Sequence, residues 1–245
     1  MIYITPMRTD FTSPNYDSRH EQHIDMLVMH YTDMHTCLDA VKRLCDPAAK
    51  VSAHYVIARD GEIFQLVDEA QRAWHAGESH WRGVSNINSR SIGIEISNPG
   101  HTEGYTPFPQ VQMDAVLKLS QEILARHAIP AQNVVGHSDI AFLRKMDPGE
   151  LFDWAWLAQH GVGIFPENVK PMTGVGFKRG DTGTPVMRLQ QSLNNWGYGL
   201  KTDGEYGEKT EKCVIAFQRH WRQSQVDGVW DGECAGILAA LHGAI

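Results

Sequence analysis

Apolar and polar positions alternate between strand-like and helix-like patterns up to about residue 165. Short strands are expected at four apolar segments, residues 26–30, 51–57, 63–67 and 134–137. Residues 38–45 and 110–127 instead repeat their apolar positions at helical spacing. The Asp60-Gly61 pair between two of the strands is a turn signal and predicts a hairpin. We therefore expect a mixed α/β domain with a central β-sheet flanked by helices.

Residues 91–97 alternate strictly in polarity, which predicts a strand with two different faces. Ile92, Ile94 and Ile96 share one face, and Gly93, Glu95 and Ser97 share the other. A buried carboxylate without partners is costly, so Glu95 either faces solvent or serves as a general acid or base. Gly93 on the same face would leave room for a substrate.

A stretch rich in proline and glycine divides the chain. It predicts a linker at residues 166–178, between a first domain at 1–165 and a second at 179–245. In the second domain, each of two helical patterns is followed by an Asp-Gly pair. Asp203-Gly204 follows residues 186–196, and Asp227-Gly228 follows residues 210–221. This weak repeat predicts a small all-α domain with Asp-Gly turns between its helices.

Charge and composition narrow the range of partners. The net charge is 22 − 29 = −7, which argues against bulk electrostatic binding to nucleic acid or to an anionic membrane surface. No run of about 18 apolar residues is present, so no membrane span is expected. The oligomeric state cannot be read from these properties.

The N-terminus and the cysteines bear on the cellular compartment. The first ten residues lack the basic start and apolar stretch of a secretory signal, so a cytoplasmic location is expected. A periplasmic location is the alternative, if a signal or lipid anchor has been removed. The four cysteines form no Cys-x-x-Cys pair and are expected to be free thiols; a Cys213–Cys234 disulfide is the alternative in an exported form.

Two histidines and one aspartate suggest a metal site. His30 and His137 each end a predicted strand, and Asp147 follows ten residues after His137 in a turn that Pro148 stiffens. Two imidazoles and a carboxylate can hold zinc and leave its fourth position free for water, as a hydrolytic site requires. The competing interpretation is that these are ordinary hydrogen-bonded side chains. Lys145 is either a surface lysine or a group that stabilises an oxyanion.

Six segments, in this order along the chain, resemble the zinc-dependent N-acetylmuramoyl-L-alanine amidases related to AmpD-type enzymes and peptidoglycan recognition proteins. They are residues 28–32, 51–55, 72–77, 91–95, 136–141 and 144–149. The resemblance implies zinc ligands at His30, His137 and Asp147, with Glu95 as the catalytic carboxylate and Lys145 as the transition-state stabiliser. It also implies a set of substrate-binding residues: Arg72, Trp74, His75, Tyr31 and Asn88.

One segment departs from the family pattern. After Ala141 the family usually has Pro-Gly or Pro-Ala, whereas this chain has Phe142-Leu143-Arg144. The shape of the loop near the second ligand is therefore not implied by the resemblance.

The second domain resembles the three-helix peptidoglycan-binding domain common in cell-wall hydrolases. The segments that carry this resemblance are 186–190, 203–207 and 216–218. Four aromatic side chains are interpreted mainly as core, with a glycan-binding platform as the alternative: Trp196, Tyr206, Trp221 and Trp230.

Together these features predict an enzyme that uses Zn²⁺ to hydrolyse the amide between N-acetylmuramic acid and L-alanine of muropeptides. The 1,6-anhydro form and a role in peptidoglycan recycling are favoured. The alternatives are an amidase on intact cell-wall peptidoglycan, a zinc hydrolase of another amide, and a non-catalytic muropeptide-recognition protein.

Overall fold

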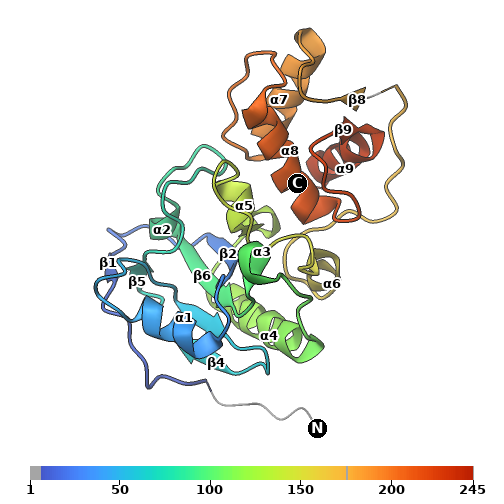
Figure 1. Cartoon of the computed structure of the whole chain (residues 1–245). Helices are drawn as coiled ribbons and strands as arrows, with labels where there is room; N and C mark the ends of the chain where they lie inside the picture. The colour runs from blue at the N-terminus through green and yellow to red at the C-terminus, as the bar shows by residue number, and fades with distance from the viewer. Residues whose placement is uncertain (1–6, 175, 245) are drawn as a thin grey trace.

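Five strands form the central sheet of the first part of the chain, in the order β4-β3-β6-β2-β7. A computed structural model describes residues 7–174 and 176–244 (Figure 1). All neighbouring pairs are parallel except β3 and β4, which form the predicted hairpin. The strands of the sheet are β2 (Met26–Tyr31), β3 (Tyr55–Ile57), β4 (Ile63–Gln65), β6 (Ser91–Ile96) and β7 (Val134–Gly136). A separate antiparallel pair, β1 (Tyr16–Ser18) and β5 (Gln71–Ala73), was not predicted.

The period of two along β2 and β6 gives the sheet an apolar face and a face that carries His30 and Glu95. Leu27 and Met29 share the apolar face with Ile92, Ile94 and Ile96, and all five are buried. His30 lies opposite Glu95 in the parallel register, so both side chains project from the other face. The predicted alternation of residues 91–97 is confirmed.

Helices cover both faces of this sheet (Figure 1). α4 packs on the apolar face, where buried α4 residues meet the isoleucines of β6. The helices of the first part are α1 (Cys37–Leu44), α2 (Ile87–Arg90), α3 (Gly100–Glu103), α4 (Gln110–Arg126), the 3₁₀ helix η1 (Ala131–Asn133), α5 (His137–Ile140) and α6 (Trp154–Gln159). The expected mixed α/β fold is confirmed.

Several predicted element boundaries differ from the structure. The strands expected at 51–57 and 63–67 are shorter, with β3 at Tyr55–Ile57 and β4 at Ile63–Gln65. His137 does not end a strand, because β7 stops at Gly136 and His137 begins α5. His127 was expected on the apolar face of a helix, but α4 ends at Arg126. The imidazole of His127 instead lies 2.7 Å from the carboxylate of Glu69, a polar partner that no apolar period can predict.

The second part of the chain is a small helical unit. Its elements are β8 (Gly176–Phe177), α7 (Thr184–Trp196), α8 (Glu208–Trp221), β9 (Trp230–Asp231) and α9 (Gly232–Gly243), with β8 and β9 paired antiparallel. The expected helical domain is confirmed, and the limits 1–165, 166–178 and 179–245 stay predictions. Those ranges include residues 1–6, 175 and 245, which lie outside the described residues, as does most of the N-terminal segment assessed for a signal.

The aromatic residues of this unit form its core. Trp196, Tyr206, Trp221 and Trp230 are all at most 3% exposed, so the alternative of a glycan platform built from them is wrong. All four cysteines are free thiols, and Cys213 and Cys234 are both buried without a disulfide.

A glutamine closes each of the two Asp-Gly turns in the same way. The side-chain oxygen of Gln190 accepts the N–H groups of Asp203 and Gly204, at 3.0 and 2.8 Å, and its amide nitrogen donates to the Asp203 carboxylate. Gln218 makes the equivalent three bonds at Asp227 and Gly228. Both glycines have positive φ, 75° and 72°, which suits a residue without Cβ. The predicted repeat is therefore a repeated turn with a buried amide at its centre.

We expect Gln190→Leu to lower the free energy of unfolding by roughly 1–3 kcal/mol, because two N–H groups lose their acceptor. Urea denaturation measures this change. Gln191→Leu, at an exposed neighbour on the same helix, is the control and should leave the midpoint nearly unchanged. Equal midpoints for both variants would show that the amide does not hold the turn.

Candidate metal centre

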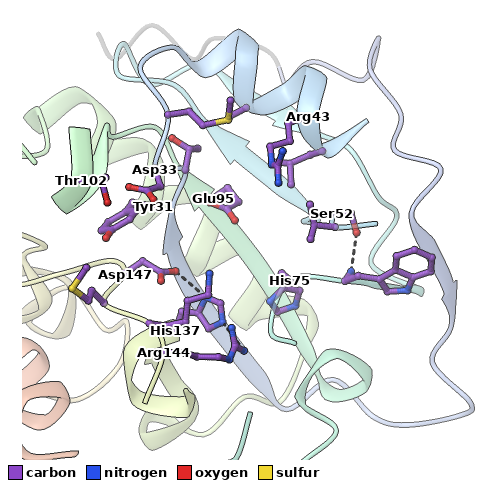
Figure 2. Close-up of a pocket in the computed structure, with 18 residues that line it drawn as sticks. Tyr31, Asp33, Arg43, Ser52, His75, Glu95, Thr102, His137, Arg144 and Asp147 are labelled. Atoms are coloured by element: carbon purple, nitrogen blue, oxygen red, sulfur yellow. Dashed lines mark hydrogen bonds and ion pairs between the residues drawn. The ribbon is translucent and has the colours of Figure 1, made fainter. Parts of the chain in front are cut away.

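A cavity of about 680 Å³ lies at the carboxyl ends of β2 and β6 (Figure 2). Residues from several segments line it, among them Tyr31, His75, Glu95, His137 and Asp147. The carboxyl edge of a parallel sheet is a common place for a ligand site, because the loops that leave the strands diverge there.

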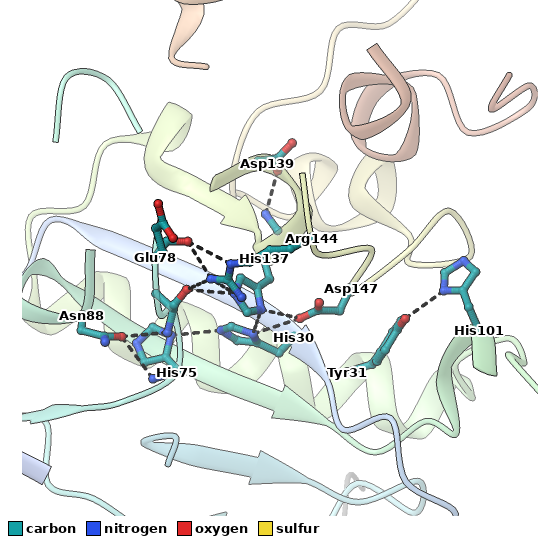
Figure 3. A network of polar contacts seen from close by, with 12 residues as sticks. His30, Tyr31, His75, Glu78, Asn88, His101, His137, Asp139, Arg144 and Asp147 are labelled. Atoms are coloured by element: carbon teal, nitrogen blue, oxygen red, sulfur yellow. Dashed lines mark hydrogen bonds and ion pairs between the residues drawn. The ribbon is translucent and has the colours of Figure 1, made fainter. Parts of the chain in front are cut away.

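Three polar atoms meet beside this cavity (Figure 3). Nδ1 of His30 lies 2.9 Å from Nδ1 of His137, and the Asp147 Oδ2 lies 3.0 and 2.9 Å from these two nitrogens. All three residues are buried. His30 comes from β2, an interior strand of the sheet, His137 from the first position of α5, and Asp147 from the loop that follows α5.

The outer ring nitrogen of His137 fixes its tautomer. Nε2 lies 3.1 Å from the carbonyl oxygen of Ala76, which can only accept, so Nε2 carries the proton. Nδ1 of His137 therefore presents a lone pair to His30 and Asp147.

A relay of three side chains fixes His30 in the same way. The Ser91 hydroxyl donates to the Ile87 carbonyl, so it accepts from Nε2 of His75. Nδ1 of His75 is then an acceptor, and it takes the proton of His30 Nε2 at 3.0 Å. The Nδ1 atom of His30 is consequently bare as well.

The electrostatics agree with a neutral His30 imidazole. Burial lowers the pKa of His30 to about 4, with a further contribution from the neighbouring His137. Three acceptors that face one another at about 3 Å repel unless they share a cation, so the donor set fits a metal ion.

Glu95 and Lys145 lie on the wall of the same cavity. Among the described residues, Oε2 of Glu95 is a buried atom without a hydrogen-bond partner. Burial, and secondly the Asp147 charge, raise the pKa of Glu95 well above its ordinary value. A carboxyl group of this kind exchanges a proton more readily near neutral pH than an exposed one.

Comparisons with known proteins agree with this site. The sequence profile described as N-acetylmuramoyl-L-alanine amidase matches residues 20–150, and a profile for a peptidoglycan binding domain matches residues 182–238. The amidase AmiD of Escherichia coli is 37% identical over 232 residues, which cover 89% of this chain and 82% of AmiD.

The chain belongs to the N-acetylmuramoyl-L-alanine amidase family.

Solved structures extend the similarity to the whole amidase. The fold of this chain matches that of E. coli AmiD in a complex with a muropeptide substrate, with a TM-score of 0.78 and 32% identity. The match covers 97% of this chain and 92% of the AmiD chain. The structure of AmpDH3 from Pseudomonas aeruginosa matches with a TM-score of 0.75 and 30% identity, and the match covers 100% of this chain and 99% of AmpDH3. The AmpD enzyme of Enterobacter cloacae is 42% identical over 105 residues, 43% of this chain and 54% of AmpD, so that match spans about half of the relative. The expected family and enzyme class are confirmed.

The structure places three of the predicted substrate-binding residues of the amidase on the cavity wall: Tyr31, Trp74 and His75. The Tyr31 hydroxyl lies 2.9 Å from Nδ1 of His101, and the backbone N–H of Trp74 donates to the Ser52 hydroxyl. The His75 side chain lies on the cavity wall, but its two ring nitrogens are hydrogen-bonded to His30 and Ser91 in the relay that orients His30.

Arg72 and Asn88 do not appear among the described residues that line the cavity. Nε and Nη2 of the Arg72 guanidinium both donate to the Asp17 carboxylate across the β1–β5 pair, at 2.5 Å. The Asn88 side-chain oxygen accepts the backbone N–H groups of His75 and Ala76. In the structure Arg72 ties two strands and Asn88 fixes the loop behind His30. Their part in substrate binding stays a prediction.

Gly93 also needs a correction. A Cβ at this position would lie 2.5 Å from Cγ of His75, so the space beside Gly93 holds the His75 ring rather than a substrate. The absence of a side chain at Gly93 allows the relay to reach His30.

The sequence analysis missed three charged residues on the cavity wall, namely Asp33, Arg43 and Arg144. Arg144 donates to the carbonyl oxygens of Ala76 and Glu78, so it bridges the loop after α5 to the loop that contacts His137. The departure Phe142-Leu143-Arg144 from the family pattern was the signal that this loop has contacts of its own. The helix that carries Arg43 was predicted, but a helical period does not tell which polar residue of its exposed face borders a cavity.

No helix in the described part of the amidase is both long and apolar enough to cross a membrane.

We expect Asp147→Ala to lower metal affinity by more than about 100-fold, because outer-shell changes alone cost 10–100-fold. Metal content after equilibration with a competing chelator is the measurement. Asp33→Ala removes a carboxylate from the same cavity without touching the three converging atoms, and should bind metal as the unaltered protein does. Full occupancy in Asp147→Ala would exclude Asp147 as a ligand.

Proposed function

We propose that this amidase uses one zinc ion to hydrolyse the amide between the lactyl group of N-acetylmuramic acid and L-alanine in 1,6-anhydro-muropeptides. The observation that carries the proposal is the set of three bare acceptors beside the unpartnered Glu95 carboxylate. Membership of the amidase family supplies the bond that is cut.

The donor set favours zinc among the metals. Two imidazole nitrogens and one carboxylate oxygen leave a fourth tetrahedral position open, the arrangement typical of catalytic rather than structural zinc. His30, His137 and Asp147 would hold the ion, which when bound polarises a carbonyl oxygen and activates water.

Glu95 is positioned to move the protons of the reaction. Its free Oε2 accepts a proton from the attacking water as the new C–O bond forms at the amide carbon. The same carboxyl group then gives that proton to the L-alanine nitrogen as the C–N bond breaks. The products are the muramic acid carboxylate and a peptide with a free amino group.

Lys145 faces the same cavity two residues before Asp147. Its ammonium group is suited to stabilise the negative charge that develops on the amide oxygen during attack. The charged wall that Arg43, Arg144 and Lys145 share is also suited to the carboxylates of a peptide stem.

The favoured substrate is the anhydro form. The AmiD structure holds an anhydro-N-acetylmuramic acid tripeptide, and an AmpDH3 structure, 30% identical to this chain with a TM-score of 0.74, holds an anhydromuramic pentapeptide. The second candidate, intact cell-wall peptidoglycan, is favoured by the match of residues 182–238 to a peptidoglycan binding domain. The expected cytoplasmic location accompanies the first substrate, and the periplasmic alternative accompanies the second.

Glu95→Gln should retain zinc and lose hydrolysis by about 10²–10⁴-fold, the usual contribution of a general acid–base group. Release of free peptide from a purified muropeptide, together with zinc content, measures both properties. Glu103→Gln, an exposed carboxylate of α3, is the control and should keep full activity. Near-normal turnover by Glu95→Gln would remove Glu95 from the mechanism.

Turnover on matched 1,6-anhydro and reducing-end muropeptides, and on purified wall polymer, tests the substrate proposal. We expect the highest kcat/KM on the anhydro form. A higher rate on the polymer would favour the second candidate, and binding of all three without cleavage would identify a recognition protein instead of an enzyme.

A further inference from the structure

The end of α8, in the second part of the chain, contacts both the segment that carries His137 and the segment that carries Asp147. His220 reaches Asp139, two residues after His137, and Arg219 reaches Glu150, three residues after Asp147. Gln223, just beyond α8, donates to the carbonyl oxygen of Phe152 at 2.6 Å. In Figure 1, α8 lies beside α5.

The contact between His220 and Asp139 is deeply buried. Nδ1 of His220 lies 2.7 Å from Oδ2 of Asp139, and the two side chains are only 3% and 1% exposed. The His220 ring is stacked between the rings of Trp154 and Trp221, with centroid distances of 3.9 and 3.7 Å. The ring is therefore held in one orientation, with Nδ1 toward the carboxylate.

Asp139 connects His220 to the backbone immediately before His137. Its Oδ2 also accepts the backbone N–H of Gly136 at 2.8 Å, which caps the first turn of α5 where His137 is the first residue. Its Oδ1 accepts the Tyr198 hydroxyl at 2.9 Å. A buried carboxylate needs partners, and two of its three come from the second part of the chain.

The Arg219 contact supports the other ligand segment. The Glu150 carboxylate lies 3.2 Å from Nε of Arg219 and 3.2 Å from Nε2 of His101. His101 in turn contacts the hydroxyl of Tyr31 on the cavity wall. These side chains are partly exposed, so this ion pair contributes less than the buried one.

The three ligands differ in how they are supported. His30 lies on β2, which pairs with a strand on each side. His137 and Asp147 lie on a four-residue helix and on a loop, which lack such support of their own. These are the two segments that α8 contacts.

We propose that His220 is a positioning residue for the metal centre. Acting through Asp139, it holds His137 at the distance from His30 and Asp147 that one ion requires, so the second domain forms part of the catalytic apparatus in addition to any role in binding peptidoglycan. This inference rests on the proposed metal-dependent function.

Competition between the full-length protein and a chromophoric chelator for zinc alone tests the proposal. His220→Phe keeps an aromatic ring in the stack and removes the donor to Asp139; we expect zinc affinity to fall by about 10–100-fold. His220→Asn places an amide N–H near the position of Nδ1 and should recover a large part of the loss. His242→Phe is the matched control, because His242 of α9 contacts Ser192 and Trp196 of its own unit, and it should bind zinc normally.

A second pair of variants tests the Asp139 contacts without changing the stacking of His220 on Trp154 and Trp221. Tyr198→Phe removes only the hydroxyl that Asp139 accepts, and should lower zinc affinity several-fold. Tyr206→Phe removes an equally buried hydroxyl that bonds to Gly228 within the second unit, and should have no effect. Thermal unfolding of the metal-free proteins establishes that each variant is folded.

The outcomes separate the two proposals. Unchanged zinc affinity in a folded His220→Phe variant would overturn the positioning role. If His220→Phe does not fold, unchanged zinc affinity in Tyr198→Phe would overturn it. Loss of affinity in His220→Phe without recovery in His220→Asn would also overturn it, since the donor would then be irrelevant. Failure of the unaltered protein to bind zinc would instead refute the metal-dependent function itself.

Discussion

Three lone pairs that point at one another are the constraint around which this molecule is arranged. Each tautomer is dictated from outside, by the Ala76 carbonyl for His137 and by the Ser91–His75 relay for His30, so neither imidazole can place a proton between them. Such an arrangement costs free energy unless a cation occupies it. The outer contacts are therefore as much a part of the site as the three side chains that converge there.

The fold supplies this constraint through one face of one sheet. The period of two puts isoleucines against α4 and leaves His30 and Glu95 side by side on the opposite face. Gly93 makes room on that face for the His75 ring, and Asn88 holds the loop from which His75 extends. Glu95 and His30 thus come from neighbouring strands, whereas His137 and Asp147 come from α5 and the loop after it.

Much of the chemistry could be predicted because it follows local patterns. The alternation at 91–97 placed Glu95 on the right face, and the spacing of His137, Asp147 and Pro148 indicated the ligands. The glycine-turn repeat was visible in the sequence, although the buried glutamines that close the turns were not. The contacts of Arg72, Asn88 and Gly93 could not be predicted. Their partners are Asp17, the His75 backbone and the His75 ring, which are distant in the sequence or are backbone atoms without a residue signature. The contact between His220 and Asp139 spans 81 positions and depends on how two units pack, which no local period encodes.

The central claim is that one metal ion binds to His30, His137 and Asp147 through the atoms that already converge. A crystal structure of the zinc-loaded protein with anomalous scattering at the zinc edge tests it most directly. We expect a single strong peak in contact with Nδ1 of both imidazoles and Oδ2 of Asp147, with the fourth position facing Glu95. A peak held by other residues, or an imidazole that turns Nε2 toward the ion, would contradict it.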